Sequence, residues 1–174
     1  MYKILITTLC LIVGLNICKA QNTVIAQTGD NIIDNNINKF VGTWKWRSDN
    51  KELTLYIKKE NIQISTGSYF KMDALVGFHK LIINNNVIEN SIQFNNTKHS
   101  DKKSTLIGRT SSVNTPNNAK VVIVHNNKNI EGTLTYISNN QIKISNIKNA
   151  PGIKINKNYN PEILFPIEMN FYRE

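Results

Sequence analysis

The amino-acid sequence predicts an all-β protein, an antiparallel up-and-down barrel of about eight to ten strands with a short N-terminal helix. Three observations favour this fold class. Many segments alternate apolar and polar residues, which is the two-residue period of a half-buried strand. Turns that are rich in asparagine or contain glycine separate these segments. Beyond one short stretch after residue 30, no segment shows a convincing 3.6-residue apolar period.

The N-terminus has the three parts of a secretory signal peptide. Lys3 gives a basic start, residues 4–17 are almost wholly apolar, and Cys18-Lys19-Ala20 fits a cleavage site. A retained signal anchor is the alternative, although the apolar run is shorter than the ~20 residues that span a membrane. We expect the mature chain in the periplasm or outside the cell. The predicted regions are a signal peptide at 1–20, a flexible lead with a short capping helix at 21–41, and the β-barrel domain at 42–174.

Composition narrows the function classes. Cys10 and Cys18 both lie in the leader, so the mature domain is expected to have no disulfide and to depend on its apolar core. Removing Lys3 and Lys19 from the formal net charge of +9 leaves +7. The basic residues are scattered rather than gathered in a block, so no nucleic-acid partner is predicted. The positive surface serves either solubility or anionic partners, such as membrane surfaces and polyanionic sugars.

The first elements of the domain are a short helix and the strand that follows it. Asp30 is the candidate N-cap of the helix. The helix carries apolar residues on one side: Ile32, Ile33, Ile37 and Phe40. Residues 43–47 alternate, which places Trp44 and Trp46, the only tryptophans, on one face of the strand. Gly42 stands where the chain turns from helix to strand.

The remaining strands are joined mostly by short polar turns. One long strand is apolar on both faces, which indicates that it bends or that both faces are covered. Residues 149–166, which contain three prolines, are predicted to cross one mouth of the barrel as a loop. The predicted strands are 52–59, a short one beginning at Ile62, 70–83 (the two-sided strand), 87–94, 105–110, 121–125, 129–138, 141–147 and 167–173.

The sequence after the helix resembles the opening of the lipocalins through Gly42-Thr43-Trp44. The resemblance implies a lipocalin-like (calycin-like) barrel whose base is closed by the tryptophan, with a basic residue from near the end of the barrel stacked over it. Gly42, Trp44 and Arg173 are therefore the candidate barrel-closing residues. The alternative for Arg173, one residue from the C-terminus, is that it points into solvent. The Thr-Asp-Tyr motif, the disulfide and the helix after the barrel of typical lipocalins have no counterpart here.

Over most of the mature chain, the sequence is similar to an uncharacterised family of small secreted bacterial proteins, a domain of unknown function. The similarity lies in the leader, in Asn38 to Trp44, and in Gly77-Phe78-His79-Lys80. This resemblance implies no activity.

Two function hypotheses remain open. The first is a barrel that binds one small apolar or amphipathic molecule, since about eight strands form the smallest barrel that holds a ligand. Its candidate wall residues are Trp46, Leu55, Phe78, Leu134, Tyr136 and Phe171. The alternative is a barrel filled by its own side chains, acting as a structural or interaction module of the cell envelope through polar loops at 95–103 and 111–118. We expect a monomer in both cases.

Motifs for catalysis or metal binding are absent from the sequence. His79, His99 and His125 lie on separate segments, and no pair has the spacing of a helix-borne metal site. Asp73 and Glu131 lie on predicted strands and are expected at outer or rim positions. We therefore predict no enzyme activity, no metal and no cofactor. A membrane-spanning barrel is disfavoured, because most predicted strands are shorter than the ~9–11 residues that this requires.

Overall fold

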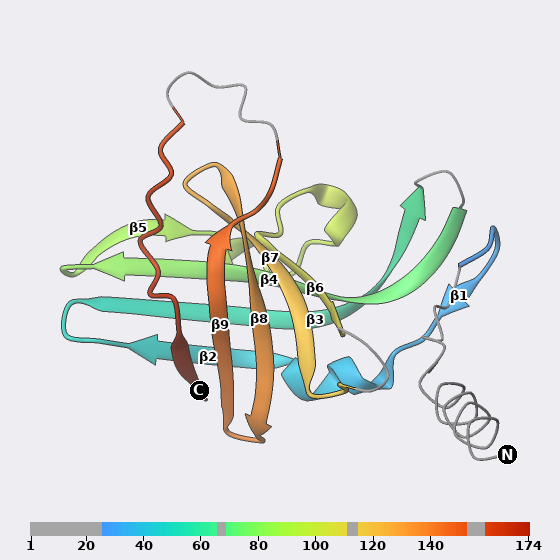
Figure 1. The fold of residues 1–174 in the computed structure, drawn as a ribbon, viewed down its shortest axis with the longest axis horizontal. Helices are drawn as coiled ribbons and strands as arrows, with labels where there is room; N and C mark the ends of the chain where they lie inside the picture. The colour runs from blue at the N-terminus through green and yellow to red at the C-terminus, as the bar shows by residue number, and fades with distance from the viewer. Residues whose placement is uncertain (1–25, 66–68, 111–114, 153–158) are drawn as a thin grey trace, which may run out of the picture.

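The computed structural model describes residues 26–65, 69–110, 115–152 and 159–174. The predicted signal peptide and the middle of the predicted loop at 149–166 lie outside these residues. The described part forms ten strands and three short 3-10 helices (Figure 1). In chain order they are β1 (Asn31–Ile32), η1 (Asn35–Phe40), β2 (Gly42–Arg47), β3 (Lys51–Ser65), β4 (Tyr69–Ile83), β5 (Asn86–Asn90), η2 (Ile92–Phe94), η3 (His99–Asp101), β6 (Leu106–Thr110), β7 (Asn118–His125), β8 (Lys128–Ser138), β9 (Gln141–Asn149) and β10 (Met169–Arg173).

Eight of the strands close into an antiparallel barrel. The hydrogen-bonded order is β4-β3-β2-β10-β9-β8-β7-β6, and a further pairing of β6 with β4 completes the ring. Two additional strands extend the sheet at β4, where β1 pairs in parallel and β5 pairs antiparallel. The predicted fold class is therefore confirmed.

Asparagine turns fix two of the hairpins. Asn84 and Asn85 have φ values of 49° and 64°, and Asn126 and Asn127 have values of 49° and 58°. Two-residue hairpin turns need positive φ at both central positions, and asparagine adopts this conformation more readily than most residues. The turns predicted from these asparagine pairs are confirmed.

The helix before the barrel begins later than predicted. Asp34, rather than Asp30, is its N-cap and accepts a hydrogen bond from the Asn36 backbone N–H. Asn31 and Ile32 are extended instead, because β4 offers an open edge at Lys71–Met72 with which they pair. The β3 strand is also one continuous element rather than two, and residues 92–94 form η2 rather than a strand.

The side chain of Asp73 is almost fully buried, although the residue lies where β4 continues beyond its pairing with β6 at one end of the barrel. Its carboxylate accepts hydrogen bonds from the Asp34 backbone N–H at 2.9 Å and from the Asn61 side chain at 3.0 Å. The Lys59 ammonium lies 2.7 Å away. Burial alone would raise the pKa of Asp73, but these hydrogen bonds and Lys59 hold it below its ordinary value. The carboxylate thereby ties the chain that precedes η1 to β3 and β4.

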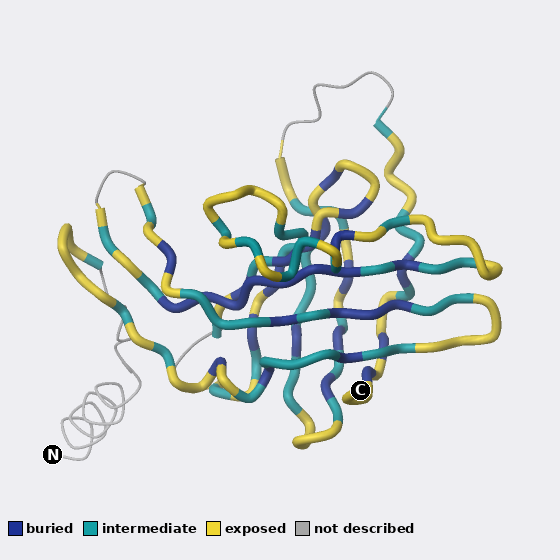
Figure 2. Tube along the Cα trace, turned by 180° about the vertical axis from the view of Figure 1, so that it is seen from behind, coloured by how far each residue is buried: buried dark blue, intermediate teal, exposed yellow. Residues whose placement is uncertain are grey.

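The two apolar faces of β4 enter two separate clusters. Leu75 and Leu81 face the barrel interior, whereas Ala74, Val76 and Phe78 face outward. Part of the outward face is covered by residues 92–94 of η2. Figure 2 shows that buried positions run through the middle of the strands while the turns are exposed. Beyond the barrel, β3 and β4 continue together as a curved two-stranded ribbon (Figure 1).

Candidate functional site

The barrel interior is filled by its own side chains. Leu55, Leu134 and Phe171 have no accessible area, and the half-buried Trp46 and Tyr136 pack against the same cluster. A void large enough for water would leave accessible area on the side chains around it, so none adjoins these three residues. Further interior side chains with no accessible area are Ile37, Phe40, Trp44, Leu53, Leu75, Leu81, Ile142 and Ile144. A ligand inside the barrel would have to displace them.

Phe78 departs from the predicted set of interior wall residues. It pairs with Tyr56 across β3 and β4, while its neighbour His79 pairs with the interior residue Leu55. Because adjacent residues on a strand face opposite sides, Phe78 points outward. It packs in the outer cluster, with the Lys58 ammonium 5.6 Å from its ring centre.

One end of the barrel is closed by Trp44 and Arg173. The guanidinium carbon lies 4.3 Å from the centre of the indole ring, and the indole N–H donates to the Phe40 carbonyl at 2.8 Å. Arg173 also donates to the carbonyls of Asn139 and Val41. Gly42 leaves room for this arrangement, because a Cβ at this position would lie only 2.5 Å from an Arg173 nitrogen. The φ of Gly42 is +145°, a backbone conformation that favours glycine. The guanidinium therefore covers the indole rather than extending freely into solvent.

Replacing Arg173 with glutamine is expected to lower the free energy of unfolding by about 1–2 kcal/mol, through loss of the cation–π contact and of two charge-assisted hydrogen bonds. Urea denaturation followed by circular dichroism would measure the change. Arg47→Gln is the matched control, because Arg47 is an exposed guanidinium whose partner is the surface carboxylate Glu52. Equal stability of the two variants would contradict a closing role for Arg173.

A buried polar cluster, which the sequence analysis did not find, lies where β4, β5 and β7 meet. One carboxylate oxygen of Glu89 accepts from His79 Nε2 at 3.0 Å and from His125 Nδ1 at 2.7 Å. The other oxygen accepts from the Asn126 backbone N–H at 2.7 Å. Both imidazoles are almost fully buried. Burial alone would raise the pKa of Glu89, but the hydrogen bonds from His125, His79 and Asn126 outweigh it and hold the pKa far below its ordinary value.

The residues that precede β10 cover this cluster. The Leu164 backbone N–H donates to His125 Nε2 at 3.2 Å, and the Phe165 ring lies 4.2 Å from the His125 ring. Lys51 donates to the Leu164 carbonyl, and Lys128 donates to the carbonyls of Asn160 and Glu162. Residues 159–166, which we call the strap, are therefore fastened to β3, β7 and β8.

The polar cluster links β4, β5 and β7 to the strap through hydrogen bonds and ring contacts. His79 lies between the Glu89 carboxylate and the Thr105 hydroxyl, which is 2.8 Å from its Nδ1. Hydroxyl, imidazole and carboxylate also follow this order in activated nucleophiles. Here, however, the Thr105 hydroxyl is 2.8 Å from that of Ser91, and the Phe165 ring packs against both imidazoles. Among the described residues, no group of three or more His, Cys, Asp and Glu side chains is arranged to hold a metal ion.

A hollow adjoins the part of the outer apolar cluster that η2 leaves uncovered. It lies between the β3–β4 ribbon and the outer faces of β6 and β7, and has a volume of about 420 Å³. Most of its lining is apolar, with Arg109 and Lys120 as its two cations. Its lining residues are Ile62, Ile64, Phe70, Met72, Ala74, Ile107, Gly108, Arg109, Lys120 and Val122. We call this the apolar hollow.

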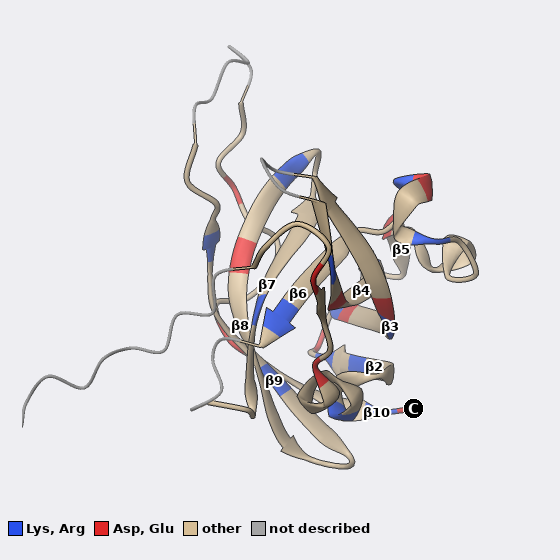
Figure 3. Ribbon diagram, turned by 90° about the vertical axis from the view of Figure 1, so that its right-hand side faces the viewer, with Lys and Arg blue, Asp and Glu red and all other residues tan. Residues whose placement is uncertain are grey.

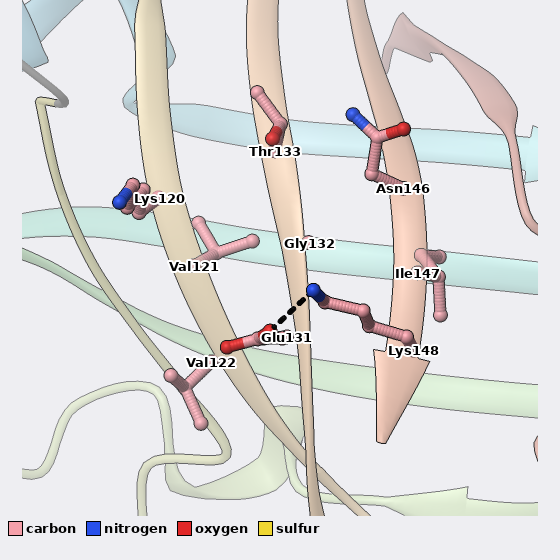
Figure 4. A pocket seen from close by; sticks show the side chains of 9 residues that line it. All are labelled: Lys120, Val121, Val122, Glu131, Gly132, Thr133, Asn146, Ile147 and Lys148. Carbon is pink, nitrogen blue, oxygen red and sulfur yellow. Dashed lines mark ion pairs between the residues drawn. The ribbon is translucent and has the colours of Figure 1, made fainter. Parts of the chain in front are cut away.

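A second hollow of about 620 Å³ adjoins the first across β7, β8 and β9. Both are lined by Lys120 and Val122. The second is more polar, and in Figure 4 the side chains of Glu131 and Lys148, which form an ion pair at 3.1 Å, point toward each other from β8 and β9. Its other lining residues are Val121, Gly132, Thr133, Asn146 and Ile147. We call this the polar hollow.

These features define a small closed β-barrel with a filled core and a partly apolar outer face. No helix in the described residues is long and apolar enough to cross a membrane. The chain belongs to a family of unknown function, DUF6705, whose model matches residues 1–171. This confirms the expected membership of a family of unknown function. None of the curated proteins and none of the solved structures compared with the chain matches it.

Proposed function

We propose that this protein is a non-enzymatic binding module, exported from the cytoplasm, that holds an amphipathic ligand on the outside of its barrel. The apolar hollow carries the proposal. Five of its lining residues belong to the outer apolar cluster: Ile62, Ile64, Met72, Ala74 and Ile107. Ile64, Met72 and Ile107 nevertheless remain partly exposed, as do Phe70 and Val122 of the same lining. An apolar concavity that is exposed on a protein surface is a common mark of a binding site.

The filled interior supports an external site. The lipocalin-like barrel would then act as a rigid frame that holds the ribbon and β6–β7 at a fixed angle. Rigidity comes from both barrel ends, where Arg173 covers Trp44 and the strap covers the Glu89 cluster. Binding sites on rigid scaffolds lose less entropy when they are occupied. The hollow is also within the range of about 300–1,000 Å³ that small-molecule sites have.

A fluorescent fatty-acid probe titrated into the purified protein is expected to bind and to be displaced by a lipid extract. Met72→Asp should weaken probe binding at least about tenfold, because a carboxylate would replace apolar contact area inside the hollow. Ile137→Asp is the matched control, since Ile137 is an exposed apolar residue of β8 that lines neither hollow. Failure of every hydrophobic probe to bind, or equal loss in both variants, would overturn the proposal.

A further inference from the structure

We propose that the ligand is an anionic single-chain phospholipid, with its acyl chain in the apolar hollow and its phosphate between Arg109 and Lys120. This inference rests on the proposed function and adds the chemical class and the orientation of the ligand. It is carried by two cations in the lining of the apolar hollow, one of which, Lys120, also lines the polar hollow.

Arg109 and Lys120 lie directly opposite each other in the antiparallel pairing of β6 with β7. Figure 3 shows basic residues on both of these strands. Like charges at opposed positions of a sheet repel each other. Neither side chain forms an ion pair or a hydrogen bond with any described residue, whereas five other lysines have a carboxylate partner: Lys45, Lys58, Lys59, Lys143 and Lys148. A bound anion would relieve the repulsion.

The apolar surface begins with the next outward-facing pair of residues on the same two strands. Ile107 pairs with Val122, two residues from the Arg109–Lys120 pair and on the same outer face. An acyl chain attached to an anion at the basic pair would therefore lie over Ile107 and Val122, which line the same hollow as Met72 of the ribbon.

The polar hollow supplies a place for the rest of the head group. Lys120 pairs with Thr133 across β7 and β8, and both residues line this hollow. Asn146, Glu131 and Lys148 add an amide and an ion pair that can hydrogen-bond to hydroxyl groups. A simple fatty acid would leave these groups unused, whereas a polar group beyond the phosphate would meet them.

Isothermal titration calorimetry with monomeric ligands of one chain length tests the assignment. Lysophosphatidylglycerol is expected to bind at least about tenfold more tightly than the neutral monoacylglycerol, and less tightly as salt concentration rises. The double variant Arg109→Gln/Lys120→Gln should reduce this preference to about one while keeping the neutral ligand's affinity. Arg47→Gln/Lys143→Gln removes two positive charges at positions that line neither hollow, and is expected to keep the preference.

The possible outcomes separate the two proposals. Equal binding of the anionic and neutral ligands, unchanged in the double variant, would overturn the phospholipid assignment and leave the proposed function intact. Binding to phosphatidylglycerol vesicles without binding of monomeric ligand would indicate a membrane surface instead, and would also overturn it. Absence of binding to every amphiphile would overturn the proposed function itself.

Discussion

Replacing Glu89 with glutamine is expected to lower the free energy of unfolding by about 2–4 kcal/mol at neutral pH. The carboxylate accepts hydrogen bonds from His79, His125 and the Asn126 backbone, and the imidazoles are almost fully buried. A glutamine side chain would direct N–H groups at some of these donors, which would leave at least one buried donor unpaired at a cost of about 1–3 kcal/mol. Loss of the negative charge weakens the remaining bonds further.

The lowered pKa of Glu89 also predicts how its contribution to stability changes with pH. The pKa of Glu89 is lowered by folding, so its contribution to stability is complete above its ordinary pKa of 4.5 and declines as pH falls below that value. The stability difference between the native protein and Glu89→Gln should therefore narrow below about pH 4.5. Urea denaturation at several pH values would measure it. Glu131→Gln, which removes a surface ion pair with Lys148, should change stability little at any pH.

If the stability difference between the native protein and Glu89→Gln stayed constant from pH 7 down to pH 3, the Glu89 charge would not support the fold. If Glu89→Gln is too unstable to purify, Glu89→Asp offers a milder comparison. This variant keeps the negative charge but shortens the side chain. It should therefore lose stability because its hydrogen bonds fit less well, and its stability should still fall at low pH.

The barrel could be predicted because its signals are local. Alternation over six to fifteen residues defines each long strand, and an asparagine pair such as Asn84-Asn85 places a turn wherever positive φ is required. The edges of elements were predicted less well. Asn31 and Ile32 look helical by composition, but the open edge of β4 pairs with them, and that edge exists only once the ribbon has formed.

The polar cluster could not be predicted, because its members come together only through the topology of the sheet. Glu89 lies 10 residues from His79 and 36 from His125 in the chain. Neither separation matches a local motif. One partial signal exists: His79 shares the inward phase of Leu75 and Leu81, and a histidine on an interior face needs a polar partner.

The apolar hollow was within reach of sequence reasoning, although the candidate wall residues did not reveal it. Ala74, Val76 and Phe78 form a second apolar face on β4, opposite in phase to Leu75. Treating Phe78 as an interior residue ignored that phase. A strand that is apolar on both faces needs a cover on each side, and η2 covers only part of the outer face. The remaining part is the hollow.

Replacing Trp44 with alanine is expected to have the largest effect, a loss of about 3–5 kcal/mol in the free energy of unfolding. The side chain is fully buried and its N–H donates to Phe40. Its removal would open a cavity beneath Arg173 and leave the Phe40 carbonyl without this donor. Since small domains are stable by about 5–15 kcal/mol, the variant would retain only part of its stability.

Urea denaturation followed by far-ultraviolet circular dichroism would measure this loss. Trp46→Ala is the matched control, because Trp46 lies on the same strand but is only partly buried. Its replacement should lower the free energy of unfolding clearly less. Each variant retains one tryptophan, so fluorescence can also report which indole lies in an apolar site. Two outcomes would mean that Trp44 does not close the barrel: equal stability losses in the two variants, or a blue-shifted emission from Trp46 alone. The rigid frame that supports the external hollow would then have to be anchored elsewhere.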